Sequence, residues 1–322
     1  MSILLALLTI CGGLVLLIGG ADRLIAGAVG LARRARLSEA VIGATIVAGG
    51  TSAPELVASV SGALAGQYGL AVGNVVGSNS FNIGFILGLV ALIAPMAVAR
   101  DIARRDVWVM VVVSIGLVGV CQWPGSLSWA IALPFLAAWA AYVVWGIHHS
   151  RRTQPAGDDA VPAAPAAPAW ASVGWVAAGI ALLTGGGWLL VHGSVDLARM
   201  AGIGDAIIGL TIVAAGTSAP ELVTSLLAAR RGQHQIAVAN IVGSNTFNIL
   251  FILGITGLLG TLPVAEEIRH RDGWVMLAFA LLLPLVWWRT MVIGRIGGSV
   301  LLAGYLAYLG VLITAVAGAP RS

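Results

Sequence analysis

The chain has 322 residues, of which 59% are hydrophobic and 9% are charged, whereas an ordinary soluble domain has roughly 25% charged residues. This composition excludes an ordinary soluble domain and indicates a protein embedded in a membrane. The formal charge of +4 comes from seventeen basic residues, all of them arginine, and their positions carry a topology signal that requires neither nucleic acid nor a protein partner.

Apolar runs long enough to cross a bilayer follow one another along the whole chain, and each crossing needs about 20 residues as a helix. The runs do not alternate apolar and polar residues over short strands, which excludes an outer-membrane barrel. The sequence therefore predicts an all-α integral membrane protein with ten spans. These spans cover about residues 3–31, 38–65, 70–96, 105–122, 127–147, 170–198, 204–228, 235–262, 272–288 and 293–317.

The arginines are distributed unevenly between the two sides of the predicted bundle. If the N-terminus lies outside, twelve arginines fall on the inner side and only four, Arg199, Arg269, Arg271 and Arg321, fall on the outer side. This split follows the positive-inside rule. We therefore expect a multi-pass protein of the cell (inner) membrane with both termini outside.

The chain contains the same pattern twice. Residues 40–59 match residues 206–225 at sixteen of twenty positions, and residues 71–90 match residues 237–256 at fourteen of twenty, both with an offset of 166. Such self-similarity indicates an internal duplication of five spans. Because five is odd, equivalent spans enter the membrane from opposite sides, and inverted repeats of this kind place their site near the bilayer midplane.

The duplication also predicts the domain organisation. A segment rich in proline, alanine and charged residues separates the two copies, and this composition is typical of a flexible linker, here on the cytoplasmic side. The predicted parts are a first repeat over 1–149 with its motif at about 40–90, the linker over 150–169, and a second repeat over 170–322 with its motif at about 206–256.

Each repeat places a proline and then a glutamate inside an apolar run, as "AGGTSAPELV" at 48–57 and "AAGTSAPELV" at 214–223. Proline removes one helical hydrogen bond and displaces the carbonyl four residues earlier. Freed carbonyls are tolerated at membrane depth only when they are buried in protein or line a wet cavity, where their oxygens can ligate cations. Glu55 and Glu221 are therefore the predicted centre of a cation site.

Other oxygen-bearing side chains recur around each glutamate at helical spacing. Hydroxyls stand three and four residues before each acid, and the following span carries Asn, Ser and Asn at every fourth position. The predicted neighbours are Thr51, Ser52, Asn74, Ser78 and Asn82 in the first repeat, and Thr217, Ser218, Asn240, Ser244 and Asn248 in the second.

An uncompensated carboxylate at the centre of a bilayer costs about 2.5 to 3.5 kcal/mol on insertion scales. The chain has no lysine, and its arginines lie near span ends except Arg23, which has Asp22 beside it. A mobile cation is the remaining partner, and hard oxygen ligands favour Ca2+ or Na+ over zinc or copper. The alternative is that these polar groups only hold helices together while each acid is protonated or hydrogen-bonded; duplication of the whole set favours the cation site.

The motifs "GTSAPEL" and "GNVVGSNSFNIGFILG", repeated as "GTSAPEL" and "ANIVGSNTFNILFILG", resemble the two alpha-repeats of the cation/calcium exchanger superfamily, and most of all its prokaryotic Na+/Ca2+ exchanger branch. The resemblance covers essentially the whole chain. It implies a ten-helix antiporter, with no permanent cofactor, that exchanges Na+ for Ca2+ by alternating access. It also implies that the glycine-rich first and sixth spans form a bundle that slides across a rigid core.

The resemblance further implies roles for the repeated residues. Glu55 and Glu221 would be the central Ca2+ ligands, shared with Na+, and Asn82 and Asn248 would occupy the central polar positions of the third and eighth spans. The hydroxyl residues that complete the Ca2+ and flanking Na+ sites would be Thr51, Thr217, Ser52, Ser218, Ser78 and Ser244, and Asn74 and Asn240 are secondary candidates.

Several exchangers of the superfamily have an aspartate at one or both positions matched by Asn82 and Asn248, whereas this chain has none there. The absence of a third carboxylate leaves open Ca2+/H+ exchange, in which the two glutamates alternate between protonated and Ca2+-bound forms. A passive channel would need a continuous water path. A membrane enzyme would need a nucleophile paired with a base, which the motif lacks.

Overall fold

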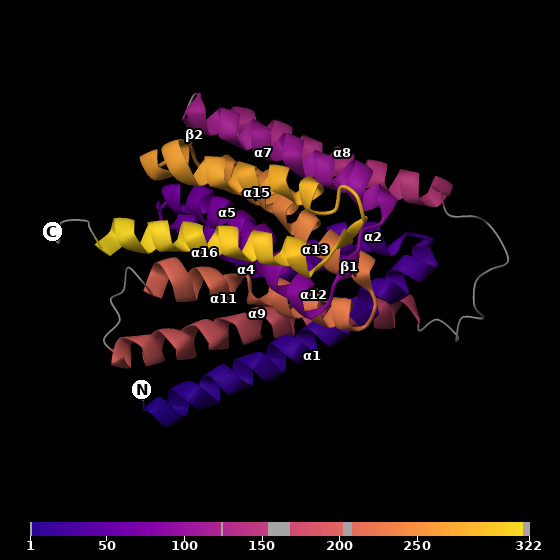
Figure 1. Ribbon diagram of the computed structural model, residues 1–322, viewed down its shortest axis with the longest axis horizontal. Coiled ribbons are helices and arrows are strands. Elements are labelled where there is room, and N and C mark those ends of the chain that lie inside the picture. The colour runs from indigo at the N-terminus through magenta and orange to yellow at the C-terminus, as the bar shows by residue number, and fades with distance from the viewer. Residues whose placement is uncertain (1, 124, 154–167, 202–207, 318–322) are drawn as a thin grey trace.

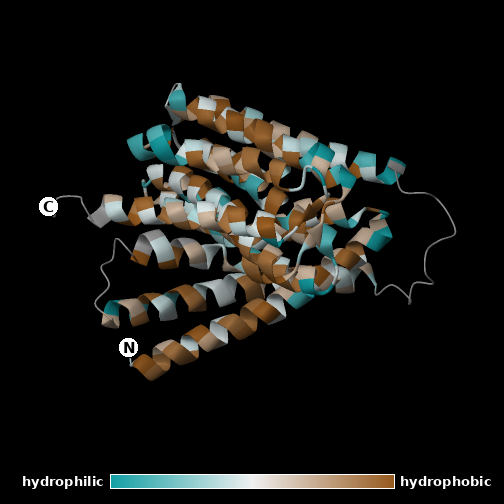
Figure 2. Cartoon of the chain, in the orientation of Figure 1, coloured by the Kyte–Doolittle hydropathy of each residue, from teal (hydrophilic) through white to brown (hydrophobic). Residues whose placement is uncertain are grey.

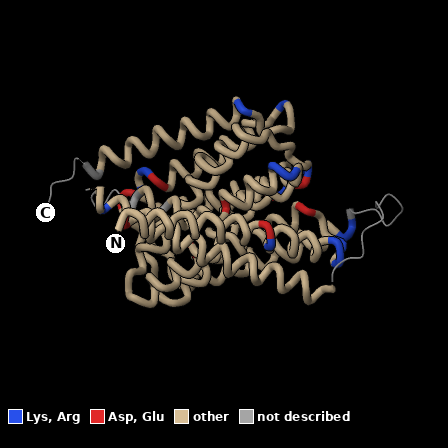
Figure 3. Tube along the Cα trace, turned by 90° about the horizontal axis from the view of Figure 1, so that it is seen from below, with Lys and Arg blue, Asp and Glu red and all other residues tan. Residues whose placement is uncertain are grey.

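The computed structural model describes residues 2–123, 125–153, 168–201 and 208–317, so that most of the predicted 150–169 linker lies outside the described residues. The described helices form a bundle, and the first of them begins at the same end of the molecule as the last one ends (Figure 1). Large apolar side chains such as Leu4, Val15 and Ile296 are exposed on its outside. Hydrophilic residues gather toward the ends of the helices (Figure 2), and so do most charged ones (Figure 3).

The first half of the chain forms long helices interrupted by short π-helical segments, which are written η. Its elements are α1 (Ile3–Ala35), α2 (Glu39–Ile42), η1 (Gly43–Val47), α3 (Ala48–Thr51), α4 (Ala53–Leu64), α5 (Gly69–Phe81), η2 (Asn82–Leu87), α6 (Gly88–Ile93), β1 (Met96–Ala97), η3 (Ile102–Asp106), α7 (Val107–Gln122), β2 (Ser126–Leu127) and α8 (Trp129–Thr153).

The second half repeats this order. Its described elements are α9 (Ala169–Met200), η4 (Gly209–Val213), α11 (Ala214–Thr217), α12 (Ala219–Arg230), α13 (His234–Phe247), η5 (Asn248–Ile252), α14 (Leu253–Leu259), β3 (Leu262–Pro263), η6 (Ile268–Asp272), α15 (Gly273–Val286), β4 (Val292–Ile293) and α16 (Arg295–Ala317).

The described helices account for the predicted spans. Seven are long and apolar enough to cross a membrane, and two bent pairs within the described residues, Glu39–Leu64 and Thr211–Arg230, bring the number to nine. The one predicted span not among these nine, residues 272–288, corresponds to η6 and α15, which carry Arg269, Arg271 and Asp272 at their start. The fold is therefore that of an all-helical membrane protein, and the beginning of its seventh predicted span lies outside the described residues.

The two halves are related as inverted repeats. Helices α1 and α9 occupy equivalent positions in the sequence and run in opposite directions (Figure 1). The two short sheets are also equivalent, because β1 pairs with β4 and β2 pairs with β3, each in antiparallel register. The π-helical segments recur as well, with η2 beginning at Asn82 and η5 at Asn248.

Glycines allow α1 and α9 to pack in close contact. A methyl group added to Gly13 would lie 2.8 Å from the carbonyl oxygen of Gly186, and one added to Gly186 would lie 2.8 Å from the carbonyl oxygen of Gly13. Gly20 and Gly179 approach the opposite helix with similar closeness. Such small-residue contacts let membrane helices associate through their backbones, so the first and sixth spans form one tightly packed pair.

Both proline motifs break their spans at a serine. Helix α3 ends at Thr51 and α4 begins at Ala53, with a bend of 48° between the two parts of the span. The equivalent bend between α11 and α12 is 52° and lies at Ser218. Proline suits the first turn of a helix, where its missing N–H leaves no hydrogen bond unmade. Pro54 and Pro220 therefore begin new helices and leave each glutamate in a first helical turn.

Candidate cation site

Glu55 and Glu221 lie at the beginning of α4 and α12, and both side chains are fully buried. The N-terminus of a helix carries unpaired backbone N–H groups and a partial positive charge, which favours a carboxylate there. Neither glutamate belongs to an ion pair in the described part of the chain. The two acids are therefore held in the protein interior without a basic side chain as partner.

Each glutamate accepts a hydrogen bond from the serine of the opposite repeat. The Ser52 hydroxyl donates to Oε1 of Glu221 at 2.8 Å, and the Ser218 hydroxyl donates to Oε1 of Glu55 at 2.9 Å. Helical spacing along the sequence placed each serine with the glutamate of its own repeat, but the chain bends at the serine and directs its hydroxyl across the repeat interface. The site is thus assembled from both repeats.

One side of the site is completed by a closed network of hydroxyl and amide groups. The Thr51 hydroxyl donates to Oδ1 of Asn240 at 3.2 Å and lies 3.5 Å from the hydroxyl of Ser244. The Ser244 hydroxyl in turn lies 3.5 Å from Oε1 of Glu221. All four side chains are fully buried, so this wall excludes solvent.

The equivalent wall of the other repeat is more open. Thr217 and Asn74 are half-buried, whereas their counterparts Thr51 and Asn240 are buried, and Ser78 is 5% exposed. Asn74 donates to the backbone carbonyl of Glu55 at 3.2 Å and to the hydroxyl of Ser59 at 2.9 Å. The predicted residues of both repeats are therefore present around the glutamates, but their burial is unequal.

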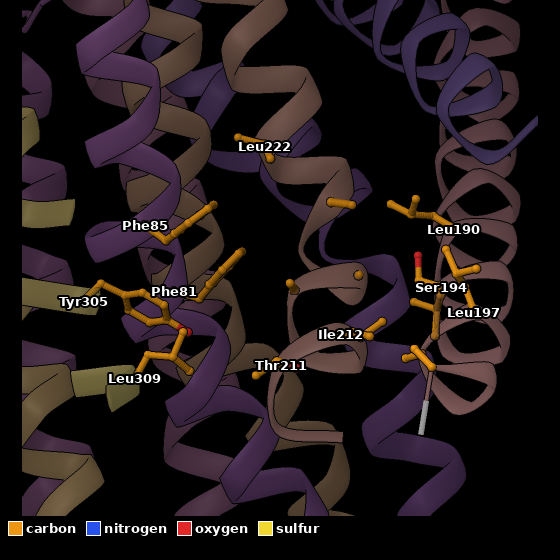
Figure 4. Close-up of a pocket in the computed structure, with 16 residues that line it drawn as sticks. Phe81, Phe85, Leu190, Ser194, Leu197, Thr211, Ile212, Leu222, Tyr305 and Leu309 are labelled. Atoms are coloured by element: carbon orange, nitrogen blue, oxygen red, sulfur yellow. The ribbon is translucent and has the colours of Figure 1, made fainter. Parts of the chain in front are cut away.

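An apolar cavity of about 710 Å3 lies on this more open side (Figure 4). Its walls come from α9, the η4–α11 segment, the start of α12, α5 with η2, and α16, and they include Ser194, Thr211, Phe81 and Tyr305. Gly216 also lines it, and this glycine stands two residues before the break at Ser218. The cavity therefore reaches the edge of the site from the end of the molecule at which α9 ends and η4 begins.

Four asparagines at the centre of the repeat interface bind one another. Asn79 donates to the backbone carbonyl of Asn245 at 3.1 Å, and Asn245 donates to the backbone carbonyl of Asn79 at 3.2 Å. Asn82 donates to Oδ1 of Asn245 at 3.1 Å, and Asn248 donates to Oδ1 of Asn79 at 3.0 Å. Asn82 and Asn248, both predicted site residues, are thus tied to two asparagines that the sequence prediction did not include.

Four buried oxygens of this set have no hydrogen-bond partner within the described protein. They are Oε2 of Glu55 and Glu221 and Oδ1 of Asn82 and Asn248. An unsatisfied buried acceptor costs about 1 to 3 kcal/mol, and carboxylate and amide oxygens are the ligands that Ca2+ and Na+ prefer to nitrogen or sulfur. The donor set therefore fits a hard cation as substrate.

A second set of repeated residues, to which the sequence assigned no role, lies away from this site. Arg105 and Asp106 form a bidentate ion pair, and the Tyr142 hydroxyl donates to Asp106 at 2.9 Å. Arg271, Asp272 and Tyr308 repeat the arrangement at the same offset of 166. That shared offset was the available signal for these residues, and it was equally available for Asn79 and Asn245.

Comparison with known proteins agrees with this architecture. Inner membrane protein YrbG of Escherichia coli (strain K12) is 34% identical over 319 residues, covering 96% of this chain and 97% of that protein. Sodium/calcium exchanger MaX1 of Methanosarcina acetivorans is 32% identical over 340 residues, covering 93% of this chain and 96% of that protein.

A solved structure and a family model also match this chain over most of its length. The structure of the sodium-calcium exchanger NCX_Mj soaked with 2.5 mM Na+ and 0.1 mM Ca2+ superposes with a TM-score of 0.81 at 30% identity, covering 96% of this chain and 99% of that one. The sequence model of the sodium/calcium exchanger protein family matches residues 5–147 and 171–314. The chain therefore belongs to the sodium/calcium exchanger protein family, and it is a multi-pass membrane transporter of cations rather than an enzyme.

Proposed function

We propose that this transporter exchanges Na+ for Ca2+ across the cell membrane by alternating access. The observation that carries the proposal is the set of four buried oxygens that have no hydrogen-bond partner among the described residues, two from carboxylates and two from amides, drawn equally from the two repeats. Two carboxylates match the charge of one Ca2+, and the neutral hydroxyl, amide and carbonyl oxygens beside them suit dehydrated Na+. The names of MaX1 and NCX_Mj as sodium/calcium exchangers support the same pair of ions.

In this proposal Glu55 and Glu221 bind Ca2+ and are shared with Na+. The remaining ligands come from residues that either contact the glutamates or lie on the same walls. They are Thr51, Thr217, Ser52, Ser218, Ser78, Ser244, Asn82 and Asn248, with Asn74 and Asn240 as supporting residues. The five-span units 1–149 and 170–322, joined by the cytoplasmic linker 150–169, each contribute one half of the site, and both termini lie outside.

The unequal walls support a state that is open toward the side of the termini. The Thr51 wall is sealed, whereas the Thr217 wall adjoins the apolar cavity between α9 and η4–α11. Exchange of the two wall arrangements between the repeats would open the opposite side, because the repeats are inverted. The tightly packed α1–α9 pair is the body that shifts in this change.

A transport assay tests the choice of ions. Purified protein in liposomes loaded with Na+ and diluted into Na+-free medium should take up radioactive Ca2+, and collapse of the Na+ gradient with an ionophore should stop the uptake. A matched liposome series with a proton gradient and no Na+ provides the comparison. Robust Ca2+ uptake on the proton gradient, with none on the Na+ gradient, would overturn Na+ coupling and identify a Ca2+/H+ exchanger.

A further inference from the structure

We propose that Asn79 and Asn245 are positioning residues that fix the amide orientation of Asn248 and Asn82, so that these two present oxygen rather than nitrogen to the transported cation. The inference rests on the proposed function, because it treats Asn82 and Asn248 as cation ligands. Asparagine needs such a device because its amide oxygen and NH2 group have nearly the same size and shape, while only the oxygen can bind a cation.

The amide orientations are determined first by two backbone carbonyls, which act only as hydrogen-bond acceptors. A backbone carbonyl can only accept a hydrogen bond, so the Asn79 group that lies 3.1 Å from the carbonyl oxygen of Asn245 must be its NH2. The other end of the Asn79 amide is then Oδ1, which can only accept. Asn245 is fixed in the same way by the backbone carbonyl of Asn79, at 3.2 Å.

The fixed oxygens determine the next pair of amides. Oδ1 of Asn79 lies 3.0 Å from Asn248, which must therefore present its NH2, and Oδ1 of Asn245 lies 3.1 Å from Asn82 with the same consequence. Each of these NH2 groups is used in this contact, and Oδ1 stands at the opposite end of the amide. Both Oδ1 atoms are buried and have no hydrogen-bond partner within the described protein.

These oxygens lie on helix faces that belong to the site. Asn82 follows Ser78 by four residues and Asn248 follows Ser244 by four, and residues at that spacing share a helix face. The Ser244 hydroxyl lies 3.5 Å from Oε1 of Glu221. A reversed amide at Asn248 would direct two N–H donors toward a cation and would bring its oxygen against Oδ1 of Asn79, so both ends of the amide would be unfavourable.

These hydrogen bonds, from backbone carbonyl to orienting asparagine to oriented asparagine, form an amide relay that crosses the repeat interface. Asn245 of the second repeat orients Asn82 of the first, and Asn79 of the first orients Asn248 of the second. Each orienting asparagine therefore acts on one specific asparagine of the other repeat, although Asn79 and Asn82 stand only three residues apart in the chain. This pairing allows an orienting role to be distinguished from a general contribution to packing.

A double-mutant cycle on the purified full-length protein tests the relay. In Asn79→Ala the Asn248 amide loses the acceptor that orients it, and we expect radioactive Ca2+ to bind about tenfold more weakly, the equivalent of one hydrogen bond. With Asn248→Asp, either carboxylate oxygen can face the cation and the other one faces the acceptor Oδ1 of Asn79, so adding Asn79→Ala to this variant should not weaken Ca2+ binding. With Asn82→Asp, the non-partner, Asn79→Ala should still cost the full tenfold.

Two controls keep the outcome clear. Ser80→Ala and Thr246→Val remove buried hydroxyls that bind only carbonyls of their own helix, and both should leave Ca2+ affinity unchanged. If Asn79→Ala does not fold, Asn245→Ala makes the mirror test, because it removes the acceptor that orients Asn82. It should weaken Ca2+ binding about tenfold in the native protein and in the Asn248→Asp variant, and it should not weaken Ca2+ binding by the Asn82→Asp variant.

Two results would overturn the relay. One is an equal loss of Ca2+ affinity when Asn79→Ala is added to the Asn248→Asp variant and to the Asn82→Asp variant. The other is an equal loss of Ca2+ affinity when Asn245→Ala is added to the Asn82→Asp variant and to the Asn248→Asp variant. Because Ca2+ binding is measured directly, failure of Na+ coupling in liposomes is a separate result.

Discussion

At the scale of single residues, the candidate site depends on two carboxylates that have no basic partner among the described residues. Their hydrogen bonds come from neutral hydroxyls, with Ser218 donating to Glu55 and Ser52 donating to Glu221. A hydroxyl stabilises a carboxylate without neutralising it, so the charge of the pair stays available for a cation. An arginine in the same place would satisfy the acids permanently and would leave nothing for a transported ion to do.

Replacement of either acid tests this arrangement. Two unit charges about 4 Å apart at an effective dielectric of 20 interact by about 4 kcal/mol, so Glu55→Gln or Glu221→Gln should lower Ca2+ exchange in liposomes by more than about 100-fold. Glu266→Gln is the matched control, because Glu266 is 70% exposed and paired with Arg269 and His270. Near-native Ca2+ exchange in either buried variant would contradict the assignment of Glu55 and Glu221 as the central ligands.

At the scale of helices, one pair of equivalent glycines has opposite environments. A methyl group on Gly243 of α13 would lie 2.5 Å from Cα of Ala44, so η1 is packed directly against this helix. Among the described residues, none places an atom within 4 Å of the same position on the equivalent Gly77 of α5. The segment before the first proline motif is therefore closed onto the core, and no described residue packs in this way against α5 at the matching place.

This difference predicts unequal effects from the same substitution. Gly243→Ala forces backbone against backbone and should lower stability by about 1 to 3 kcal/mol, as overpacking usually does, with loss of exchange activity. Gly77→Ala adds a methyl group where no described atom lies within 4 Å, and it should change stability little. Thermal unfolding of the two purified variants in detergent makes the comparison, and equal melting temperatures would show that the two glycines have the same surroundings.

The sequence predicted much of this fold, because its strongest signals were long apolar runs and a repeat with a constant offset of 166. It also predicted Glu55, Glu221 and their hydroxyl neighbours as site residues. Placing such residues inside a membrane costs free energy, so their repeated presence in an apolar run indicates a function. It did not predict that Ser52 donates its hydrogen bond to Glu221 of the other repeat, because contacts between the repeats depend on the bend at the serine. Asn79 was overlooked because its spacing does not match the i, i+4 series of Asn74, Ser78 and Asn82.

At the scale of the whole molecule, the open wall and the apolar cavity lie toward one end of the bundle. Gly77 precedes Phe81 by one helical turn, and Phe81 lines that cavity. In the proposed function, this arrangement opens the site toward the side where both termini are predicted and closes it toward the side of the linker. The unequal walls would then belong to one state of the exchange cycle, since the two repeats have nearly the same motif.

Thiol labelling tests that access. In a Cys11→Ala, Cys121→Ala background, Gly77→Cys should react with a membrane-impermeant maleimide added outside intact cells, at least about tenfold faster than Ser80→Cys, since thiol reactivity follows exposure. Ser80 is fully buried on the same helix, which makes it a matched control. Reaction of Gly77→Cys only in inverted vesicles would reverse the predicted orientation of the termini.

The reciprocal hydrogen bonds between repeats have a consequence for the origin of the molecule. Ser52 binds Glu221 while Ser218 binds Glu55, and Asn79 and Asn245 exchange identical bonds. Contacts in which residue i meets j and j meets i are those of an isologous dimer with two-fold symmetry. A single ancestral five-span polypeptide, inserted in both orientations and paired with its own copy, could form every one of these bonds. Fusion of the two copies through a linker would then require no new hydrogen bond at the repeat interface.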